Sequence, residues 1–353
     1  MPISRRGSHK AGPSKVRSSS VWATATAALR NQRVAPGAQQ ARFFSPWSLA
    51  AGLACLLVIA FLGTAGWRLG QLAAEAVAAI RFERPKLADV PPRPAFTPYV
   101  DEPLDRALRE TGLPGGALGV SVRHLTSGAT ASLNPQRSFH AASLAKLPIL
   151  VEVFKQQRLR HFTWDDELVI TREQWTDGSG VLQARVGQSL KVGALLRLMI
   201  EQSDNITANV LLDLVGVANV NRTAESMGLR QTHLPARGES SAPTTSADDL
   251  SRLLEAMASG KLIDAATSEE ALRLLEAKQD RSWLSDGLPW WAKLAHKWGD
   301  VPTSRHDAGI IFTPRNQYVL VVLTESDNAS LAAERIGQIS RLVFDHFEDG
   351  ARN

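Results

Sequence analysis

The order of the expected strands and helices predicts an α/β (α+β) fold, in which an antiparallel sheet is flanked by helices and joined to a helical subdomain. Alternating apolar residues predict an early strand hairpin at 118–125 and 129–133. Apolar stripes at helical spacing fill the middle of the chain. A second group of strands lies between residues 294 and 324, and a last helix follows it. Early and late strands separated by helices are expected to share one largely antiparallel sheet.

The first 42 residues are strongly basic. They contain eight Lys or Arg residues and no Asp or Glu, with little periodicity, so we expect a disordered tail. The whole chain has a formal net charge of +5, and removing these eight cations leaves the remainder slightly negative. The charge therefore makes no case for a nucleic-acid partner of the main part. Binding of nucleic acid or anionic lipid by the tail alone is an alternative.

Residues 43–67 contain no charged side chain. About 20 apolar helical residues cross a bilayer, and Trp47 and Trp67 stand near the two ends, where interfacial aromatic residues are common. The basic tail precedes this run, so the positive-inside rule places the N-terminus in the cytoplasm and the rest of the chain outside the cell membrane. We expect a single-pass anchor. A cleaved signal peptide is the alternative, although the basic region and the apolar run are both long for one.

Residues 68–83 are expected to continue as an alanine-rich helix, and the prolines that follow predict a stiff, extended linker. These are Pro85, Pro91, Pro92, Pro94 and Pro98. We therefore divide the chain into a disordered basic cytoplasmic tail at 1–42, a transmembrane anchor at 43–67, a helix and Pro-rich linker at 68–99 and a folded domain at 100–353.

The single cysteine, Cys55, lies in the apolar run. The chain therefore cannot form an internal disulfide or a metal site built from several cysteines, and it contains no His-Glu-x-x-His motif. We expect no metal or other cofactor.

The first helix of the folded domain is predicted from its apolar residues. They recur at i, i+3, i+4 and i+7, at Leu147, Leu150, Val151 and Phe154. Pro148 removes one backbone donor inside this helix, so we expect a local distortion. The later helices are expected at 192–200, 206–214, 248–258, 265–277 and 332–343, and the late strands at 294–298, 307–313 and 317–324.

Ser143 and Lys146 stand three residues apart where this first helix begins, so they share a face of it. A serine hydroxyl is a poor nucleophile unless a base lies beside it. A lysine can be that base if burial and a second cation lower its pKa. Such a Ser-x-x-Lys pair is expected by chance about once in a chain of this size. The pair alone is therefore weak evidence for a catalytic site, and other motifs in the chain must support it.

Two further motifs follow in order, so that the chain carries Ser143-x-x-Lys146, then Ser203-Asp204-Asn205, then Lys297-Trp298-Gly299. Their order and separation resemble the penicillin-recognising serine hydrolases, whose signature is Ser-x-x-Lys, Ser-Asp-Asn and Lys-Thr-Gly. The resemblance is closest to class A β-lactamases and related β-lactamase-like serine hydrolases, and it covers roughly residues 100–348. It implies a β-lactamase/transpeptidase-like fold, with Gly178-Ser179-Gly180 before the central helix as a further similar feature.

The resemblance implies catalytic roles for the first two motifs. Ser143 would attack a carbonyl and form an acyl-enzyme. Lys146 would take the proton of Ser143, and Ser203 would relay a proton to the leaving nitrogen.

The resemblance also implies substrate-binding roles. Asn205 would hold a substrate amide, and Lys297 would attract a substrate carboxylate and help to keep Lys146 neutral. Gly299 and Asp300 would line the substrate site, and the backbone N–H groups of Ser143 and Asp300 would form the oxyanion hole.

The third motif departs from the family pattern. Trp298 replaces a Thr or Ser whose hydroxyl helps to bind the substrate carboxylate, and we expect the indole to change the pocket. Asp300 adds a negative charge beside the oxyanion hole, which would disfavour acylation unless the side chain points away.

The loop that carries the deacylating Glu of class A enzymes also departs from the pattern. In place of Glu-x-x-Leu-Asn, this chain reads Arg237-Gly238-Glu239-Ser240-Ser241-Ala242. We interpret Glu239 as a solvated loop carboxylate, with activation of water as the alternative. Without such a base the acyl-enzyme would persist, as in a penicillin-binding D-alanyl-D-alanine peptidase or a slow esterase.

Two other patterns have structural interpretations. A second Ser-Asp-Asn, at Ser326-Asp327-Asn328, lies before the last helix, where these residues cap helices. His306 and Asp307 suggest a Ser-His-Asp triad, but the chain has no Gly-x-Ser-x-Gly elbow to support one. We interpret His306 as structural.

The first hypothesis is therefore a bacterial, membrane-anchored serine hydrolase that acts through a Ser143 acyl-enzyme on β-lactams or on cell-wall peptide amides and esters. The alternative is a catalytically impaired domain that binds or senses the cell wall, which Trp298 and Asp300 motivate. The sequence does not distinguish β-lactamase, peptidase and esterase.

Overall fold

The computed structural model describes residues 83–89, 97–277, 279 and 282–350. The expected tail at 1–42 and the expected anchor at 43–67 lie outside these residues. Within the described ranges, every helix is too short or too polar to cross a membrane. The chain divides into two compact units, 1–75 and 76–353, and all described residues belong to the second.

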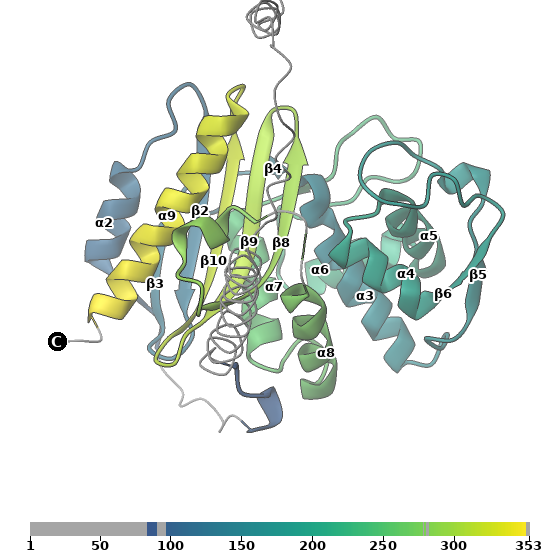
Figure 1. Cartoon of the computed structure of the whole chain (residues 1–353), viewed down its shortest axis with the longest axis horizontal. Coiled ribbons are helices and arrows are strands. Elements are labelled where there is room, and N and C mark those ends of the chain that lie inside the picture. The colour runs from purple at the N-terminus through teal and green to yellow at the C-terminus, as the bar shows by residue number, and fades with distance from the viewer. Residues whose placement is uncertain (1–82, 90–96, 278, 280–281, 351–353) are drawn as a thin grey trace, which may run out of the picture. The chain divides into compact units, whose positions relative to one another are not determined.

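A six-stranded sheet organises the second unit, with strand order β1-β3-β2-β10-β9-β8 (Figure 1). The early hairpin is β2 (Ala117–His124) with β3 (Ala129–Leu133). The late strands are β8 (Lys293–Val301), β9 (Ser304–Phe312) and β10 (Gln317–Glu325). Since β10 pairs with β2, early and late strands share one sheet as predicted. The sheet is mixed and not purely antiparallel, because the short β1 (Tyr99–Val100) pairs in parallel with β3.

One face of the sheet is covered by α2 (Glu102–Glu110) and α9 (Ala329–Gly350), which lie together in Figure 1. The alternation predicted for β2 is confirmed, since Leu118, Val120 and Val122 join the core on this side. The sequence analysis did not predict α2. Its start is fixed by Asp101, whose carboxylate accepts the Leu104 N–H at 3.2 Å.

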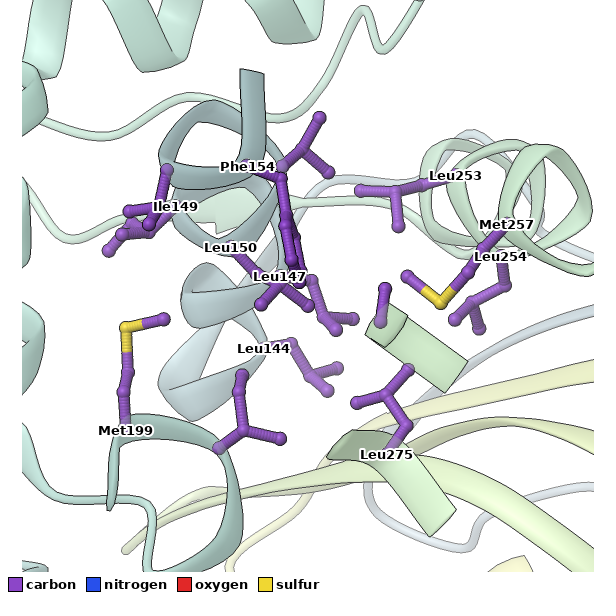
Figure 2. Packing of buried hydrophobic residues seen from close by; sticks show 14 of the residues in the cluster. Leu144, Leu147, Ile149, Leu150, Phe154, Met199, Leu253, Leu254, Met257 and Leu275 are labelled. Carbon is purple, nitrogen blue, oxygen red and sulfur yellow. The ribbon is translucent and has the colours of Figure 1, made fainter. Parts of the chain in front are cut away.

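The other face is covered by α7 (Ala247–Ala258) and α8 (Ala265–Glu276). A separate helical part contains α3 (Lys146–Arg158), α4 (Val192–Glu201), α5 (Asn205–Val215) and α6 (Val217–Ser226), and it lies to the side of the sheet in Figure 1. In Figure 2, Leu147, Leu150 and Phe154 of α3 point into a cluster with side chains of α4 and α7. Ile149 and Val153 are buried as well, so α3 is enclosed on several sides and forms the centre of the helical part.

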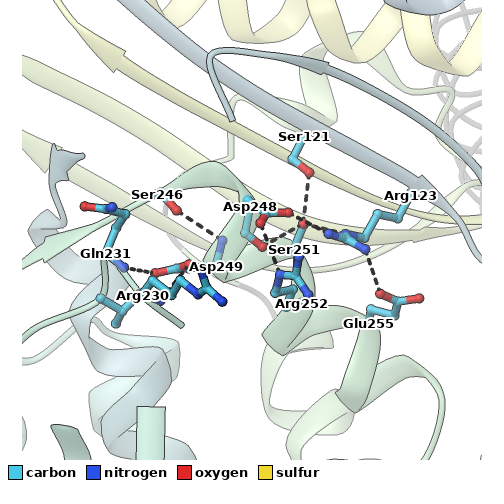
Figure 3. Close-up of polar contacts among 11 residues, drawn as sticks. Ser121, Arg123, Arg230, Gln231, Ser246, Asp248, Asp249, Ser251, Arg252 and Glu255 are labelled. Atoms are coloured by element: carbon cyan, nitrogen blue, oxygen red, sulfur yellow. Dashed lines mark hydrogen bonds and ion pairs between the residues drawn. The ribbon is translucent and has the colours of Figure 1, made fainter. Parts of the chain in front are cut away.

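A polar network holds α7 against the sheet (Figure 3). Arg123 of β2 donates to Asp248 at 2.6 Å and to the Ser251 hydroxyl at 2.8 Å. Ser121, two residues earlier on the same face of β2, donates to Ser251 at 2.9 Å. Ser121 and Arg123 are the polar residues that alternate with the apolar residues of β2. The polar face of β2 therefore lies against α7.

Pro148 does not distort the helix. A 3₁₀ turn, η2 (Ala142–Ala145), precedes α3, which begins at Lys146 and continues to Arg158. Pro148 therefore lies in the first turn, where backbone N–H groups have no partner within the helix. The expectation of a distortion was wrong because it placed the start of the helix too early.

Two small sheets complete the described part: β4 (Phe139–His140) with β7 (Thr244–Thr245), and β5 (Glu167–Val169) with β6 (Ser189–Lys191). Three further 3₁₀ turns are η1 (Leu87–Asp89), η3 (Arg172–Gln174) and η4 (Leu284–Gly287). Because β4 leads directly into η2, it delivers the Ser143 segment to the edge of the main sheet, where η2 packs against β8.

The second Ser-Asp-Asn is a helix cap, as predicted. The Asn328 side chain accepts the Leu331 N–H at 3.0 Å, directly before α9 begins at Ala329. The Ser326 hydroxyl accepts the Asn328 N–H at 3.1 Å. The same tripeptide therefore has a purely structural use here.

Candidate active site

Ser143 and Lys146 meet where η2 passes into α3. Side chains three residues apart lie above one another in a 3₁₀ turn, and the Lys146 Nζ lies 3.1 Å from the Ser143 Oγ. The sequence spacing therefore brings the expected nucleophile and the expected base into direct contact.

Lys146 is enclosed, with 4% of its surface exposed. Its Nζ donates to the Ser203 carbonyl at 2.5 Å and to the Asn205 Oδ1 at 2.7 Å. Burial lowers the pKa of Lys146 to about 7, and the charge of Lys297 acts in the same direction against the opposing effect of Asp204. A substantial fraction of this amine is therefore neutral near pH 7, with a lone pair that can accept a proton.

Ser203 lies between α4 and α5 and is fully buried, with a backbone φ of +53°. Its hydroxyl donates to the Ser143 Oγ at 2.9 Å and lies 3.1 Å from the Lys146 Nζ. A left-handed φ is costly for a residue with a side chain and persists only where the surroundings enforce it. This strained position completes a triangle of polar groups made by the Ser143 hydroxyl, the Lys146 amine and the Ser203 hydroxyl.

Asp204 holds that position in place. Its carboxylate accepts the Thr207 N–H at 2.9 Å as the N-cap of α5, and it also accepts the Val181 N–H at 2.7 Å. A Cβ at Gly180 would lie 2.1 Å from the Asp204 carboxylate, so this approach requires glycine. The Gly178-Ser179-Gly180 segment is thereby fixed beside the second motif.

Asn205 is engaged at both ends of its amide. Its Oδ1 accepts from Lys146, and its Nδ2 donates to the Asp177 carbonyl at 3.2 Å. One lone pair and one N–H of the amide are left for a substrate. Its role in holding a substrate amide stays a prediction.

Lys297 and Gly299 lie on the face of β8 that is turned toward η2. Lys297 is fully buried, and its Nζ donates to the Trp298 carbonyl at 3.2 Å. A Cβ at Gly299 would lie 3.2 Å from the Ser143 N and 3.2 Å from the Ala142 Cβ. The glycine of the third motif therefore allows β8 to approach the backbone N–H of Ser143 closely.

The Trp298 ring does not line the cavity wall as expected, but it contacts the cation of the third motif, since the Lys297 Nζ lies 4.7 Å from the ring centroid. Alternate residues of a strand point to opposite faces, and the Trp298 ring packs edge-on against Trp283, with ring centroids 6.1 Å apart. Trp298 is absent from the lining of the cavity that contains Ser143. Its effects on the site are therefore the missing hydroxyl and the contact with Lys297, while it adds no bulk to the cavity wall.

Asp300 forms an ion pair with Arg305, its partner across the β8–β9 ladder. The positive charge of Arg305 compensates the carboxylate, so the structure removes part of the expected penalty on a nearby oxyanion. Asp300 still contributes to the cavity wall.

The cavity at Ser143 has a volume of about 610 Å³. Lys146 and Asn205 lie on its wall, and so do Thr176 and residues 234–239. Glu239 is an exposed residue on this wall, and its carboxylate accepts from the Ser241 hydroxyl at 3.4 Å. The space is sufficient for a small-molecule substrate.

His306 is structural by its contacts. Its Nε2 bonds to the His140 carbonyl at 2.7 Å, and its Nδ1 accepts the Thr324 N–H at 3.1 Å. Burial lowers the pKa of His306 to about 4, so the ring is neutral. Asp307 bonds to His296 at 2.7 Å and not to His306, so these two residues form no triad with Ser143.

The sequence analysis missed His140. Its Nδ1 accepts the Ala142 N–H at 2.9 Å, and Ala142 has a φ of +48° directly before Ser143. His140 also lines the cavity. The sequence signal was its place three residues before the expected nucleophile.

Among the described residues, no group of three or more His, Cys, Asp or Glu side chains is arranged to hold a metal ion.

Comparison with known proteins gives one consistent result. A family model described as "Beta-lactamase enzyme family" matches residues 102–347. A β-lactamase of Citrobacter koseri is 27% identical over 115 residues, which are 32% of this chain and only 39% of that relative.

Solved structures match over more of the fold. The structure of a PBP-A mutant as an acyl-enzyme complex with penicillin G has a TM-score of 0.67 at 26% identity, covering 72% of this chain and all of that one. A β-lactamase from Sphaerobacter thermophilus has a TM-score of 0.64 at 26% identity, covering 70% of this chain and 96% of that one.

Proposed function

Because the chain belongs to the beta-lactamase enzyme family through residues 102–347, we propose that it is a serine hydrolase in which Ser143 forms an acyl-enzyme. The substrates are β-lactams or the amide and ester bonds of cell-wall peptides. The observation that carries this proposal is the Ser143 hydroxyl, which lies within 3.1 Å of both Lys146 Nζ and Ser203 Oγ on the wall of a cavity of about 610 Å³.

Acylation begins at Lys146. The neutral amine takes the proton of the Ser143 hydroxyl as the Oγ bonds to the substrate carbonyl carbon. The carbonyl oxygen becomes an oxyanion, and the backbone N–H groups of Ser143 and Asp300 are the candidate donors for it. The Ser203 hydroxyl then gives its proton to the leaving nitrogen and recovers one from Lys146, and the C–N bond breaks.

Substrate binding rests on charge. Lys297 is fully buried and close enough to Lys146 for its charge to act there, and in this proposal the same cation attracts a substrate carboxylate. The hydroxyl that would share this task is absent at Trp298, so carboxylate binding depends more on Lys297 alone. We therefore expect weaker binding of penicillins than in a family member with the full third motif.

Deacylation is slow in this proposal. The carboxylates on the cavity wall within the described residues are Glu239 and Asp300. Asp300 is paired with Arg305, and Glu239 is exposed and lacks the family's loop pattern. The known partners of these carboxylates are Ser241 for Glu239 and Arg305 for Asp300. A persistent acyl-enzyme fits a penicillin-binding peptidase or a slow esterase better than an efficient β-lactamase.

The test is intact mass of the purified chain after incubation with a penicillin, with Ser143→Ala as the control. We expect an added mass equal to the drug that is absent in the variant. Rapid loss of drug without an adduct, again only with Ser143, would indicate an efficient β-lactamase. Neither adduct nor turnover, with esters and wall peptides also inert, would contradict the proposal and favour an impaired wall-binding or sensing domain.

We also propose, from the sequence alone, that residues 43–67 anchor the chain in the cell membrane with the catalytic domain outside. The uncharged run and the basic tail before it support this. Fractionation tests it: the full chain should stay with the membrane in high salt and be released by detergent. Release by salt alone would contradict anchoring.

A further inference from the structure

Arg84, ahead of the folded domain, is bound to two glutamates of α8 by its guanidinium. The Nη1 and Nη2 of Arg84 donate to the two carboxylate oxygens of Glu269 at 3.1 and 3.0 Å. The Nε donates to Glu276, and Nη2 also reaches Glu276 at 3.4 Å. The second N–H of Nη1 donates to the Pro85 carbonyl at 3.0 Å. A guanidinium has five N–H donors, and all five have acceptors here.

This contact is buried, unlike an ordinary surface ion pair. The Arg84 side chain is 6% exposed, and the Glu269 side chain is 12% exposed. Burial alone would lower the pKa of Arg84, but its bonds to Glu269 and Glu276 outweigh that effect and raise the pKa above its usual range. A bidentate, desolvated arginine–carboxylate pair holds both partners in one geometry.

Neighbouring residues extend the contact. The Leu87 N–H donates to Glu269 at 3.0 Å, and the Leu87 side chain packs against the main apolar core. The Arg84 guanidinium also lies 5.3 Å from the centre of the Phe312 ring, at the end of β9. Figure 1 shows η1 beside α8, which in turn packs on β8.

We propose that residues 84–87 act as a strap, meaning a short segment that attaches the N-terminal part of the chain to α8 and holds it there. Since Leu87 and Tyr99 are then both held by the same domain, the Pro-rich stretch between them joins two points of that domain and does not act as the tether. The connection between residue 67 and the first fixed point of the domain then spans residues 68–83 instead of 68–99, which is half as many residues. This inference does not depend on the activity of Ser143.

Limited trypsin digestion of the full-length chain tests the strap. Lys86 is exposed, but cleavage after it requires residues around Leu87 to leave α8. We expect the Lys86–Leu87 bond to be cut at least ten times faster in Arg84→Ala than in the unaltered chain. Trypsin cuts poorly before proline, so replacing Arg84 removes no efficient site. A surviving domain-sized fragment shows that the variant is folded.

Three variants sharpen the result. Glu269 accepts three of the bonds and Glu276 accepts two, so Glu269→Gln should speed the cut more than Glu276→Gln. Arg109 pairs with Asp105 on the surface with its side chain 68% exposed, so Arg109→Ala should leave the rate unchanged. Equal cutting of the unaltered chain and Arg84→Ala would overturn the strap, and so would equal acceleration by Arg109→Ala.

Discussion

Burial and the neighbouring cation of Lys297 both lower the pKa of Lys146. The low pKa of about 7 means that the base form is lost as the pH falls below 7 and is complete well above it. The acylation rate should therefore rise with pH through a midpoint near 7. Removing the cation in Lys297→Ala should raise the pKa of Lys146 and move this midpoint upward by about one pH unit.

The readout is the rate of covalent labelling at saturating penicillin from pH 5 to 9. Lys293→Ala is the control, because this lysine lies on the same strand but lines a different cavity. A midpoint that stays at the same pH in Lys297→Ala would show that Lys297 does not tune Lys146.

Ser203 and Ser326 offer a matched pair, since both stand in a Ser-Asp-Asn sequence. Ser203→Ala should reduce acylation by about 10²–10⁴-fold, because a proton relay beside the nucleophile is lost. Ser326→Ala should leave acylation unchanged and lower the free energy of unfolding by about 1 kcal/mol, through one lost hydrogen bond. Labelling kinetics and urea unfolding measure the two effects. Equal labelling by both variants would remove Ser203 from the mechanism.

His140 acts on Ser143 through the backbone of Ala142. An acceptor on the side chain holds the Ala142 N–H and so supports the left-handed turn that orients the Ser143 N–H. His140→Ala should lower the maximal acylation rate by about tenfold, with little change in the penicillin concentration at half-saturation. His140→Asn keeps an acceptor and should recover most of the rate. If Asn behaves as Ala does, the hydrogen bond is not the reason for the loss.

At the scale of elements, the site depends on how closely β8 approaches η2. The Cβ of Gly299→Ala would stand 3.2 Å from the Ser143 N, beside the candidate oxyanion position. We expect acylation to fall by about 10²-fold, the usual cost of disturbing one oxyanion donor. Gly112→Ala is the control because a Cβ there meets nothing within 4 Å. Normal labelling by Gly299→Ala would mean that Ser143 N–H does not bind the oxyanion.

The same two strands show where sequence reasoning succeeded and where it stopped. Strand alternation alone places Lys297 and Gly299 on one face and Trp298 on the other. The indole was expected to change the pocket, and the structure places its ring against Trp283 and 4.7 Å from the Lys297 Nζ. It also ended one strand at 298 and began the next at 307, whereas the ladder continues to Val301 and Ser304. That extension places Arg305 opposite Asp300, which no local pattern revealed.

At the scale of the whole molecule, the sequence predicted that motifs far apart in the chain belong to one site. This was possible because each motif lies at or near the end of a predicted strand or helix. Ser143, Ser203 and Lys297 were predicted as one constellation, and the fold brings their segments together. His140 and Arg84 were not found, because a side chain that supports the backbone or a linker carries no periodic signal. Such contacts depend on the tertiary fold and not on local residue order.

The structure supports the two halves of the catalytic cycle, acylation and deacylation, to different degrees. Three segments converge on Ser143 for acylation, but no described carboxylate on the cavity wall has a comparable set of contacts for activating water. Glu239→Gln should therefore change the decay rate of the acyl-enzyme by less than about twofold, whereas removal of a true general base typically costs 10²–10⁴-fold. Intact mass followed over time after removal of free penicillin measures this decay. A hundredfold slower decay in Glu239→Gln would show that the exposed loop carboxylate closes onto the acyl-enzyme, and the chain would then work as a β-lactamase.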